Sequence, residues 1–437
     1  MEKKNDKSII RSWAMFDWAN SAYNLVITST IFPAYYTIIT TTEENGDKVS
    51  FFGMQFVNTA LSNYALSAAY LVMAVLLPLL SSTADYHGNK KTFMKLFTYM
   101  GGAACIGLFF FKLETLELGI ICFIIAAMGY IGGVMFNNSY LPEIATPEEQ
   151  DRVSAKGFAY GYVGSVLLQI ICFVFVLKPE WFGITDGSLP ARLSFLLVGV
   201  WWIVFAQIPF RKLPKGSQNH EKLNTRSVHS GFQELQKVWR QLGHTPVLKR
   251  FLLGFFFYSM GVQTVMLVAA NFGEKILHLG TAKLIGIILI IQIVAIAGAF
   301  VMSFFAKRSG NIPVLIGVLI IWVGVCFSAY FIENEYQFYV LAAIVGLVMG
   351  GIQSLSRSTY SKFLPENTPD TASYFSFYDV TEKLAIVIGL FSFAYIEEFT
   401  GSMRNSALFL NVFFLIGMFV LVSVLYVKKT QPEFQPE

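Results

Sequence analysis

The chain has 437 residues, of which 55% are hydrophobic and 14% are charged, and its formal net charge is +4. A soluble domain carries about 25% charged residues, so this composition excludes a soluble enzyme or binding domain and indicates a membrane protein with several spans. The four cysteines lie in apolar runs without a CxxC pair, so we expect no redox function, metal site or cofactor.

The first apolar stretch, residues 12–40, is long enough to cross a bilayer as one helix, yet it is not uniformly apolar. Five polar residues share one face at helical spacing: Asp17, Asn20, Ser21, Asn24 and Thr28. Such a stripe cannot face lipid, because an unsatisfied polar group costs of order 2–7 kcal/mol there. We therefore predict a bundle with a polar interior, and Asp17, Asn20 and Asn24 are candidate binding residues.

Apolar runs predict an all-α membrane protein with twelve transmembrane helices. The runs are 12–40, 54–81, 92–111, 119–141, 154–177, 191–210, 249–273, 282–305, 312–332, 337–360, 372–396 and 406–427. The longest polar segment separates two pseudo-symmetric halves of six. We expect an N-terminal half at 1–210, a linker at 211–248 and a C-terminal half at 249–437.

The Lys and Arg residues predict the orientation in the membrane. Segments on the side of the termini hold 24 of the 32, the opposite loops hold seven, and Lys383 lies within a span. By the positive-inside rule, both termini are expected in the cytoplasm, with the protein in the plasma (inner) membrane. Within the linker, Phe232, Leu235, Trp239 and Leu242 form the apolar face of a predicted amphipathic helix on the membrane surface.

Two turns with similar sequences indicate an internal repeat. SSTADYHGNKK at 81–91 follows the second span, and SFFAKRSGN at 303–311 follows the eighth. They align without gaps, with Asp85 opposite Lys307 and Gly88 opposite Gly310. A period of six helices is typical of transporter folds.

The turn at 81–91 resembles the signature loop of the major facilitator superfamily, G-x-x-x-D-R-x-G-R-[RK]. Asp85, Gly88 and Lys90 match, whereas Ser81 and Tyr86 depart from the pattern. The resemblance implies a cytoplasmic latch, in which the carboxylate caps a neighbouring helix terminus and pairs with a basic residue of the other half when the protein is open outward. The alternative is a solvated turn that only reverses the chain.

Four further stretches resemble one branch of that superfamily, the autophagy-related vacuolar amino-acid effluxers of fungi. They are SWAMFDWANSAY, GYVGSVLLQ, GGIQSLSRSTYSKFLP and SFYDVTEKLAIVIG, and they lie in both halves. The branch typically has an acid before Gly261, but this chain has Met260, which puts a coupling role for span seven in doubt.

Charged residues within spans are functional candidates, because each costs at least about 2.5 kcal/mol at a helix centre. On span eleven, Asp379 and Lys383 are four residues apart and are expected to pair, leaving Glu382 as the less neutralised carboxylate and a candidate for proton coupling. The alternative is a local ion pair with Glu382 bonded to neighbouring hydroxyl groups.

Span ten carries Gln353 and Arg357, four residues apart. Arg357 could hold a substrate carboxylate bidentately, or it could snorkel to the membrane surface or cap an inner loop. Further neutral candidates are Asn137, Asn138, Tyr258 and Gln263 on spans four and seven.

We expect a secondary transporter of a small polar solute working by alternating access. The resemblance suggests amino acids or peptide-like solutes and a coupled proton. A non-transporting sensor or scaffold with the same fold remains the alternative. Motifs for ATP binding or hydrolysis are absent from the sequence, so the chain is not expected to be an enzyme. Expected partners are the solute, a proton and the lipid bilayer, with no nucleic acid, and the chain is expected to be a monomer.

Overall fold

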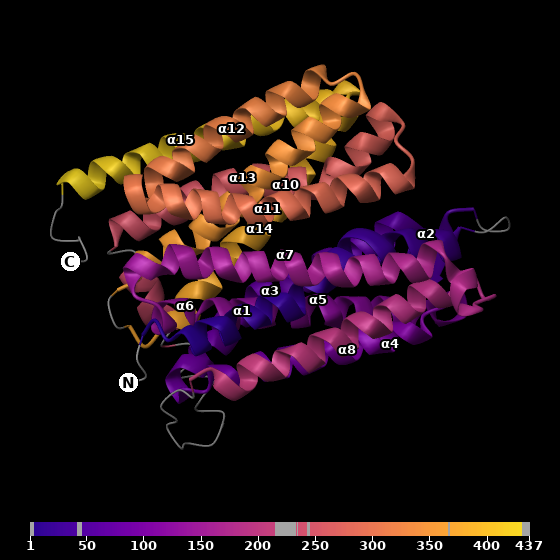
Figure 1. Cartoon of the computed structure of the whole chain (residues 1–437), viewed down its shortest axis with the longest axis horizontal. Helices are drawn as coiled ribbons and strands as arrows, with labels where there is room; N and C mark the ends of the chain where they lie inside the picture. The colour runs from indigo at the N-terminus through magenta and orange to yellow at the C-terminus, as the bar shows by residue number, and fades with distance from the viewer. Residues whose placement is uncertain are drawn as a thin grey trace.

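The computed structural model describes residues 4–41, 46–214, 233, 235–242, 245–365 and 368–430. Their helices form two bundles, α1 to α8 and α10 to α15, which lie side by side with their helices running in the same general direction (Figure 1). The beginning of α1 and the end of α15 lie at one end of the molecule, which we call the terminal side (Figure 1).

The N-terminal bundle contains α1 (Lys7–Ala22), the π-helix η1 (Tyr23–Ile31), α2 (Phe32–Thr40), α3 (Asn58–His87), α4 (Lys90–Gly107), α5 (Leu116–Asn138), α6 (Leu141–Ile144), α7 (Pro147–Leu177) and α8 (Leu189–Lys212). The C-terminal bundle contains α10 (Pro246–Leu277), α11 (Thr281–Ser309), α12 (Asn311–Phe331), α13 (Glu335–Lys362), α14 (Thr371–Thr400) and α15 (Met403–Thr430). Single-turn 3-10 helices, η2 (Leu108–Phe110), η3 (Leu113–Thr115) and η4 (Pro179–Phe182), lie in the loops.

Ten of the described helices are long and apolar enough to cross a membrane. Two other helical segments stand in the places of the first and eleventh predicted spans. Residues 7–40 form one helical run divided by η1, and α14 has 30 residues but carries three charged side chains near its middle. The predicted all-helical membrane fold in two halves is confirmed.

A short antiparallel hairpin, β1 (Lys48–Phe51) and β2 (Met54–Val57), precedes α3 and was not predicted. Its turn residues Phe52 and Gly53 have φ angles of 47° and 81°, the left-handed region that glycine favours. The second span therefore begins at Asn58, after the hairpin, and not at residue 54.

The first span begins with a capped α-helix. The Asp6 carboxylate accepts hydrogen bonds from the backbone N–H groups of Ile9 and Ser8, and these bonds lower the pKa of Asp6. From Tyr23 the helix widens into nine residues of π-helix. The single α-helical period assumed for residues 12–40 is therefore wrong beyond Ala22. Long π-helical segments are rare and are frequently found at functional sites.

Glycines allow close backbone contact between α11 and α13. A Cβ atom at Gly298 would meet the Leu347 carbonyl, and one at Gly350 would meet the Ala295 carbonyl. Small residues at such positions let membrane helices pack by van der Waals contact.

We expect Gly350→Ala to destabilise the protein, because overpacking costs about 1–3 kcal/mol when backbone atoms must move. The control is Gly317→Ala on α12, where an added Cβ meets open space. That change should be neutral or should stabilise by roughly 0.5–1 kcal/mol through helix propensity. Thermal unfolding of the purified variants in detergent measures both effects, and equal midpoints would contradict the close packing of α11 and α13.

Candidate functional site

Arg357 on α13 reaches from the C-terminal half into the N-terminal half. Its Nη1 atom lies 3.1 Å from Asp17 Oδ2 and donates to Asn138 Oδ1 at 2.9 Å. Its Nε atom donates to Ser154 Oγ at 2.9 Å, and Nη2 donates to the Ser154 carbonyl at 2.8 Å. Asn137 Nδ2 donates to the other Asp17 oxygen at 3.2 Å. The structure thus brings together candidates from spans one, four and ten.

The guanidinium also contacts aromatic faces. It lies 4.8 Å from the ring centroid of Trp13 and 4.2 Å from that of Phe158, distances typical of cation–π contacts. Gly157 on α7 makes room for the group, because a Cβ there would lie 2.5 Å from Asp17 Oδ2 and 2.7 Å from Arg357 Nη2. Arg357 is only 3% exposed, so the prediction that it snorkels to the surface is wrong.

A second polar contact joins the halves next to this pair. Tyr162 on α7 donates from its hydroxyl to Gln353 Oε1 at 2.6 Å, and Gln353 Nε2 lies 3.4 Å from Met266 Sδ. Within the C-terminal half, the Tyr258 hydroxyl shares a 2.7 Å hydrogen bond with Ser356. Gln353 therefore lies between the halves, whereas Tyr258 contacts α13 within its own half.

A charged cluster lies on α14. Lys383 Nζ lies 2.7 Å from Glu382 Oε2 and 3.4 Å from Asp379 Oδ1. Gln263 on α10 donates to Glu382 Oε1 at 3.0 Å. Asp379 Oδ2 is buried and has no hydrogen-bond partner among the described residues. The prediction that Glu382 is the less neutralised carboxylate is therefore wrong, and Asp379 is the less satisfied group.

Two tyrosines of the N-terminal half face this charged cluster. Tyr70 on α3 and Tyr130 on α5 are close enough to Lys383 and Glu382 to interact with them electrostatically. Tyr130 also interacts electrostatically with Asp17. The charged residues of α13 and α14 thus lie along the contact between the halves.

The turn after α3 contacts the C-terminal half at the terminal side. Asp85 accepts hydrogen bonds from the backbone N–H groups of Ala372 at 3.2 Å and Ser373 at 2.7 Å, in the first turn of α14. A carboxylate is favoured at a helix N-terminus, where free N–H groups and the helix dipole are positive. Gly88 ends α3 with a φ of 63°. Lys90 pairs with Glu143 and donates to Thr371 Oγ1 at 2.7 Å.

A second contact between the halves involves the repeated turn. Asn311, the first residue of α12, donates to Asp151 Oδ1 of α7 at 2.7 Å. Lys362, the last residue of α13, pairs with the other Asp151 oxygen at 2.6 Å. Contacts at both pseudo-symmetric turns therefore join the halves at the terminal side. At the first turn the carboxylate is Asp85 of the turn itself, and at the second it is Asp151 of the opposite half.

Two predicted residues lie apart from these contacts. Asn20 is buried next to Ser21, and its amide nitrogen has no partner among the described residues. Asn24 lies in the π-helix and is partly exposed. Asp17 and Asn20 are buried, as the polar-stripe prediction required.

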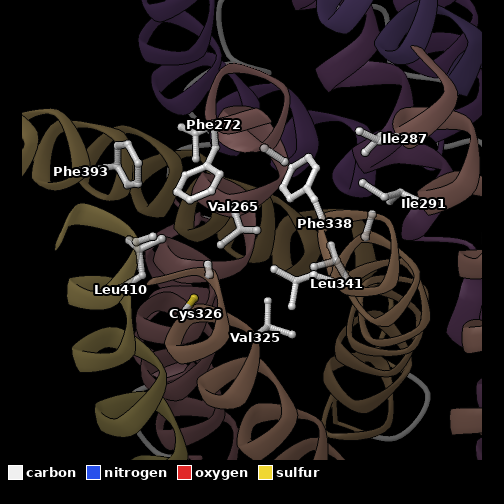
Figure 2. Close-up of a pocket in the computed structure, with 16 residues that line it drawn as sticks. Val265, Phe272, Ile287, Ile291, Val325, Cys326, Phe338, Leu341, Phe393 and Leu410 are labelled. Atoms are coloured by element: carbon white, nitrogen blue, oxygen red, sulfur yellow. The ribbon is translucent and has the colours of Figure 1, made fainter. Parts of the chain in front are cut away.

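An apolar pocket lies in the C-terminal half, toward the end of the bundle opposite the terminal side (Figure 2). Its sixteen lining residues include Val265, Phe272, Ile291, Phe338 and Leu410, and the only heteroatom of their side chains is the Cys326 sulfur. Such a lining cannot satisfy a polar solute. This pocket therefore does not fit the polar solute that the sequence leads us to expect.

The corresponding end of the N-terminal half is filled by rings. Phe32 stacks on Phe123 with centroids 4.1 Å apart and lies within 6 Å of Tyr36 and Phe111. The two halves therefore share a fold but differ in how their interiors are packed.

Sequence reasoning missed Ser154, Tyr162, Tyr70 and Tyr130. Ser154, Gly157 and Gly161 recur at helical spacing, so this row of small residues was a signal that another helix packs closely there. The three tyrosines belong to a large aromatic population of 20 tyrosines and 42 phenylalanines, and nothing local distinguishes them. Among the described residues, no cluster of three or more His, Cys, Asp or Glu side chains could hold a metal ion.

Comparisons with known proteins agree with this architecture. The family model described as "Vacuole effluxer Atg22 like" matches residues 5–435. The chain is 31% identical over 415 residues to an uncharacterized MFS-type transporter, YxiO, of Bacillus subtilis (strain 168), covering 94% of each protein. It is 25% identical over 466 residues to Autophagy-related protein 22 of Yarrowia lipolytica, covering 86% of this chain and 77% of that protein.

Solved structures show the same fold at low sequence identity. The human organic anion transporter MFSD10 (TETRAN) matches with a TM-score of 0.72 and 10% identity, covering 96% of this chain and 100% of that one. FucP in the outward conformation, a Major Facilitator Superfamily transporter, matches with a TM-score of 0.70 and 11% identity, covering 96% and 99%. This multi-pass integral membrane protein therefore belongs to the Atg22-like vacuole effluxer family and has the fold of major facilitator superfamily transporters.

Proposed function

We propose that this transporter moves a small polar solute by alternating access and couples that movement to protons. The family resemblance suggests amino acids or peptide-like solutes. The proposal rests on one observation above all, the buried pair between Arg357 and Asp17, which belongs to both halves at once. When the halves separate on the terminal side, this pair must break, so its formation and loss accompany each transport cycle.

The charges along the contact between the halves support coupling to a cation. With every group ionised, Asp17, Asp379 and Glu382 are paired, among the described residues, with two positive charges, those of Arg357 and Lys383. An unbalanced charge is unfavourable in a medium of low polarity. One proton, or one positively charged group of the solute, would balance the set.

We infer that both termini face the cytoplasm, because Lys and Arg residues are concentrated on that side of the spans. The contacts at Asp85, Lys90 and Asp151 would then form a cytoplasmic latch, closed in this structure. We propose that the protein acts as a monomer, because the two halves of one chain complete the polar contact between them.

The function can be tested with purified protein in lipid vesicles. Amino acids and dipeptides are first screened for a shift in thermal unfolding, and those that bind are then tested for flux under an imposed pH gradient. We expect at least one such solute to move, and to move uphill when the gradient is applied. If a solute binds but crosses no faster than it crosses empty vesicles, the protein is a sensor and not a carrier.

A further inference from the structure

The described part of the linker, residues 235–242, is helical and packs against the beginning of α14. Val238 is completely buried and Leu242 is 8% exposed, and both belong to the hydrophobic core. The Trp239 ring lies 5.5 Å from the Phe377 ring of α14 but remains 62% exposed. Leu242 of the predicted apolar face thus packs against the protein itself, Trp239 remains available to a membrane surface, and Phe232 lies outside the described residues.

Two polar contacts also position the linker helix against the beginning of α14. Lys237 Nζ lies 3.2 Å from Asp370 Oδ2, and the Tyr374 hydroxyl donates to Gln241 Oε1 at 3.1 Å. Asp370 is 5% exposed and immediately precedes α14. The linker helix therefore contacts residues 370–377, the first two turns of α14.

The N-terminal half holds these same turns from its own side. Asp85 accepts from the backbone of Ala372 and Ser373, and Lys90 donates to Thr371. Asp370 is near enough to Asp85 for the two carboxylates to repel each other. A cation beside Asp370 weakens that repulsion, and Lys237 of the linker is such a cation.

The linker is also fastened where it leaves the N-terminal half. Lys91 Nζ donates to the Leu213 carbonyl at 2.7 Å, and the Tyr140 hydroxyl lies 3.4 Å from the Pro214 carbonyl. One covalent segment thus contacts the N-terminal half at its beginning and the C-terminal half at its helix. Both contacts lie at the terminal side, near the position of Asp85.

We propose that the linker helix is a strap that stabilises the closed terminal side by holding the start of α14 where Asp85 can cap it. The inference rests on the proposed alternating access. Lys237 beside Asp370 adds to the positive charge that Lys90 already places beside Asp85, and Val238 anchors the helix that carries Lys237. Release of the strap removes one cation and one packing contact from the start of α14 and favours separation of the halves.

The test is a distance measurement across the terminal side in lipid nanodiscs. Spin labels are placed at Arg211→Cys, at the end of α8, and at Arg308→Cys, at the end of α11, both exposed and in different halves. The four native cysteines are buried, so labelling should be confined to the introduced sites. Double electron–electron resonance then gives the fraction of molecules with the long distance of an open terminal side.

We expect Lys237→Glu to increase the open fraction at least threefold, and the added change Asp370→Lys to restore it by reversing the pair. Arg240→Glu is the matched control, because it makes the same charge change on the same helix at an exposed position. It should leave the open fraction as in the unmodified protein. Val238→Asp removes the anchor without altering Lys237 and should also open the terminal side.

Asp85→Asn provides the reference for an open terminal side. If it increases the open fraction while Lys237→Glu and Val238→Asp do not, the strap is disproved and alternating access stands. An increase with Arg240→Glu equal to that with Lys237→Glu also disproves the strap, because the effect is then one of general charge. If no variant, including Asp85→Asn, changes the distance, both the strap and the alternating-access proposal fail.

Discussion

Arg357→Ala is expected to abolish solute flux and to destabilise the protein. The change leaves Asp17 buried without its cation, and breaking a buried pair by removing one partner costs about 3–5 kcal/mol. Because every 1.4 kcal/mol is about a factor of ten, the population of the terminal-side-closed form relative to other states should fall by roughly two to four orders of magnitude. Vesicle flux and thermal unfolding measure the two consequences separately.

Two matched variants separate charge from geometry at this pair. Arg357→Lys keeps the charge but cannot reproduce the four donated bonds to Asp17, Asn138 and Ser154, so it should restore stability only in part and flux very little. Asp17→Asn combined with Arg357→Gln removes both charges and should recover stability without flux. Normal flux in the double variant would show that the pair is only structural.

Asp379→Asn is expected to uncouple solute movement from protons. The substitution keeps the size of the side chain but removes the carboxylate whose Oδ2 atom has no partner among the described residues. At one proton per solute, a pH gradient of one unit supports about tenfold accumulation, since one pKa unit corresponds to about 1.36 kcal/mol. Accumulation should fall to equilibrium in the variant, whereas exchange of labelled for unlabelled solute should persist.

Glu382→Gln is the comparison for this experiment. Glu382 already has Lys383 and Gln263 as partners, and after its replacement Lys383 can still pair with Asp379. The variant should therefore keep most of the pH-driven accumulation. The assignment to Asp379 is contradicted if Glu382→Gln loses accumulation and Asp379→Asn retains it, and proton coupling at this cluster is contradicted if both retain it.

The overall architecture was predictable because lipid imposes strong rules on sequence. Apolar runs of the required length and the repeat of the turn at Asp85 in the turn before Asn311 indicated two helical halves. The burial of Asp17 followed from the cost of a charge in hydrocarbon. These arguments depend on local composition and on spacing within one helix.

The contacts of the site could not be predicted in the same way. Asp17 and Arg357 are 340 positions apart, and the local sequence around each residue does not indicate that the other is its partner. The sharing of Lys383 between Asp379 and Glu382 depends on side-chain rotamers that helical spacing does not determine. The widening of the first span begins at Tyr23, ten residues before Pro33, and no residue of the segment 23–31 is a proline or glycine that would mark where it starts.

The unequal filling of the two halves has a mechanical consequence. Stacked rings around Phe32 pack that end of the N-terminal half closely. In the C-terminal half, the side chains that line the pocket beside Val265 and Phe338 lack van der Waals contacts on one side. We therefore expect the C-terminal bundle to be the softer of the two. In the proposed alternating access, the elastic deformation should fall mainly on that bundle.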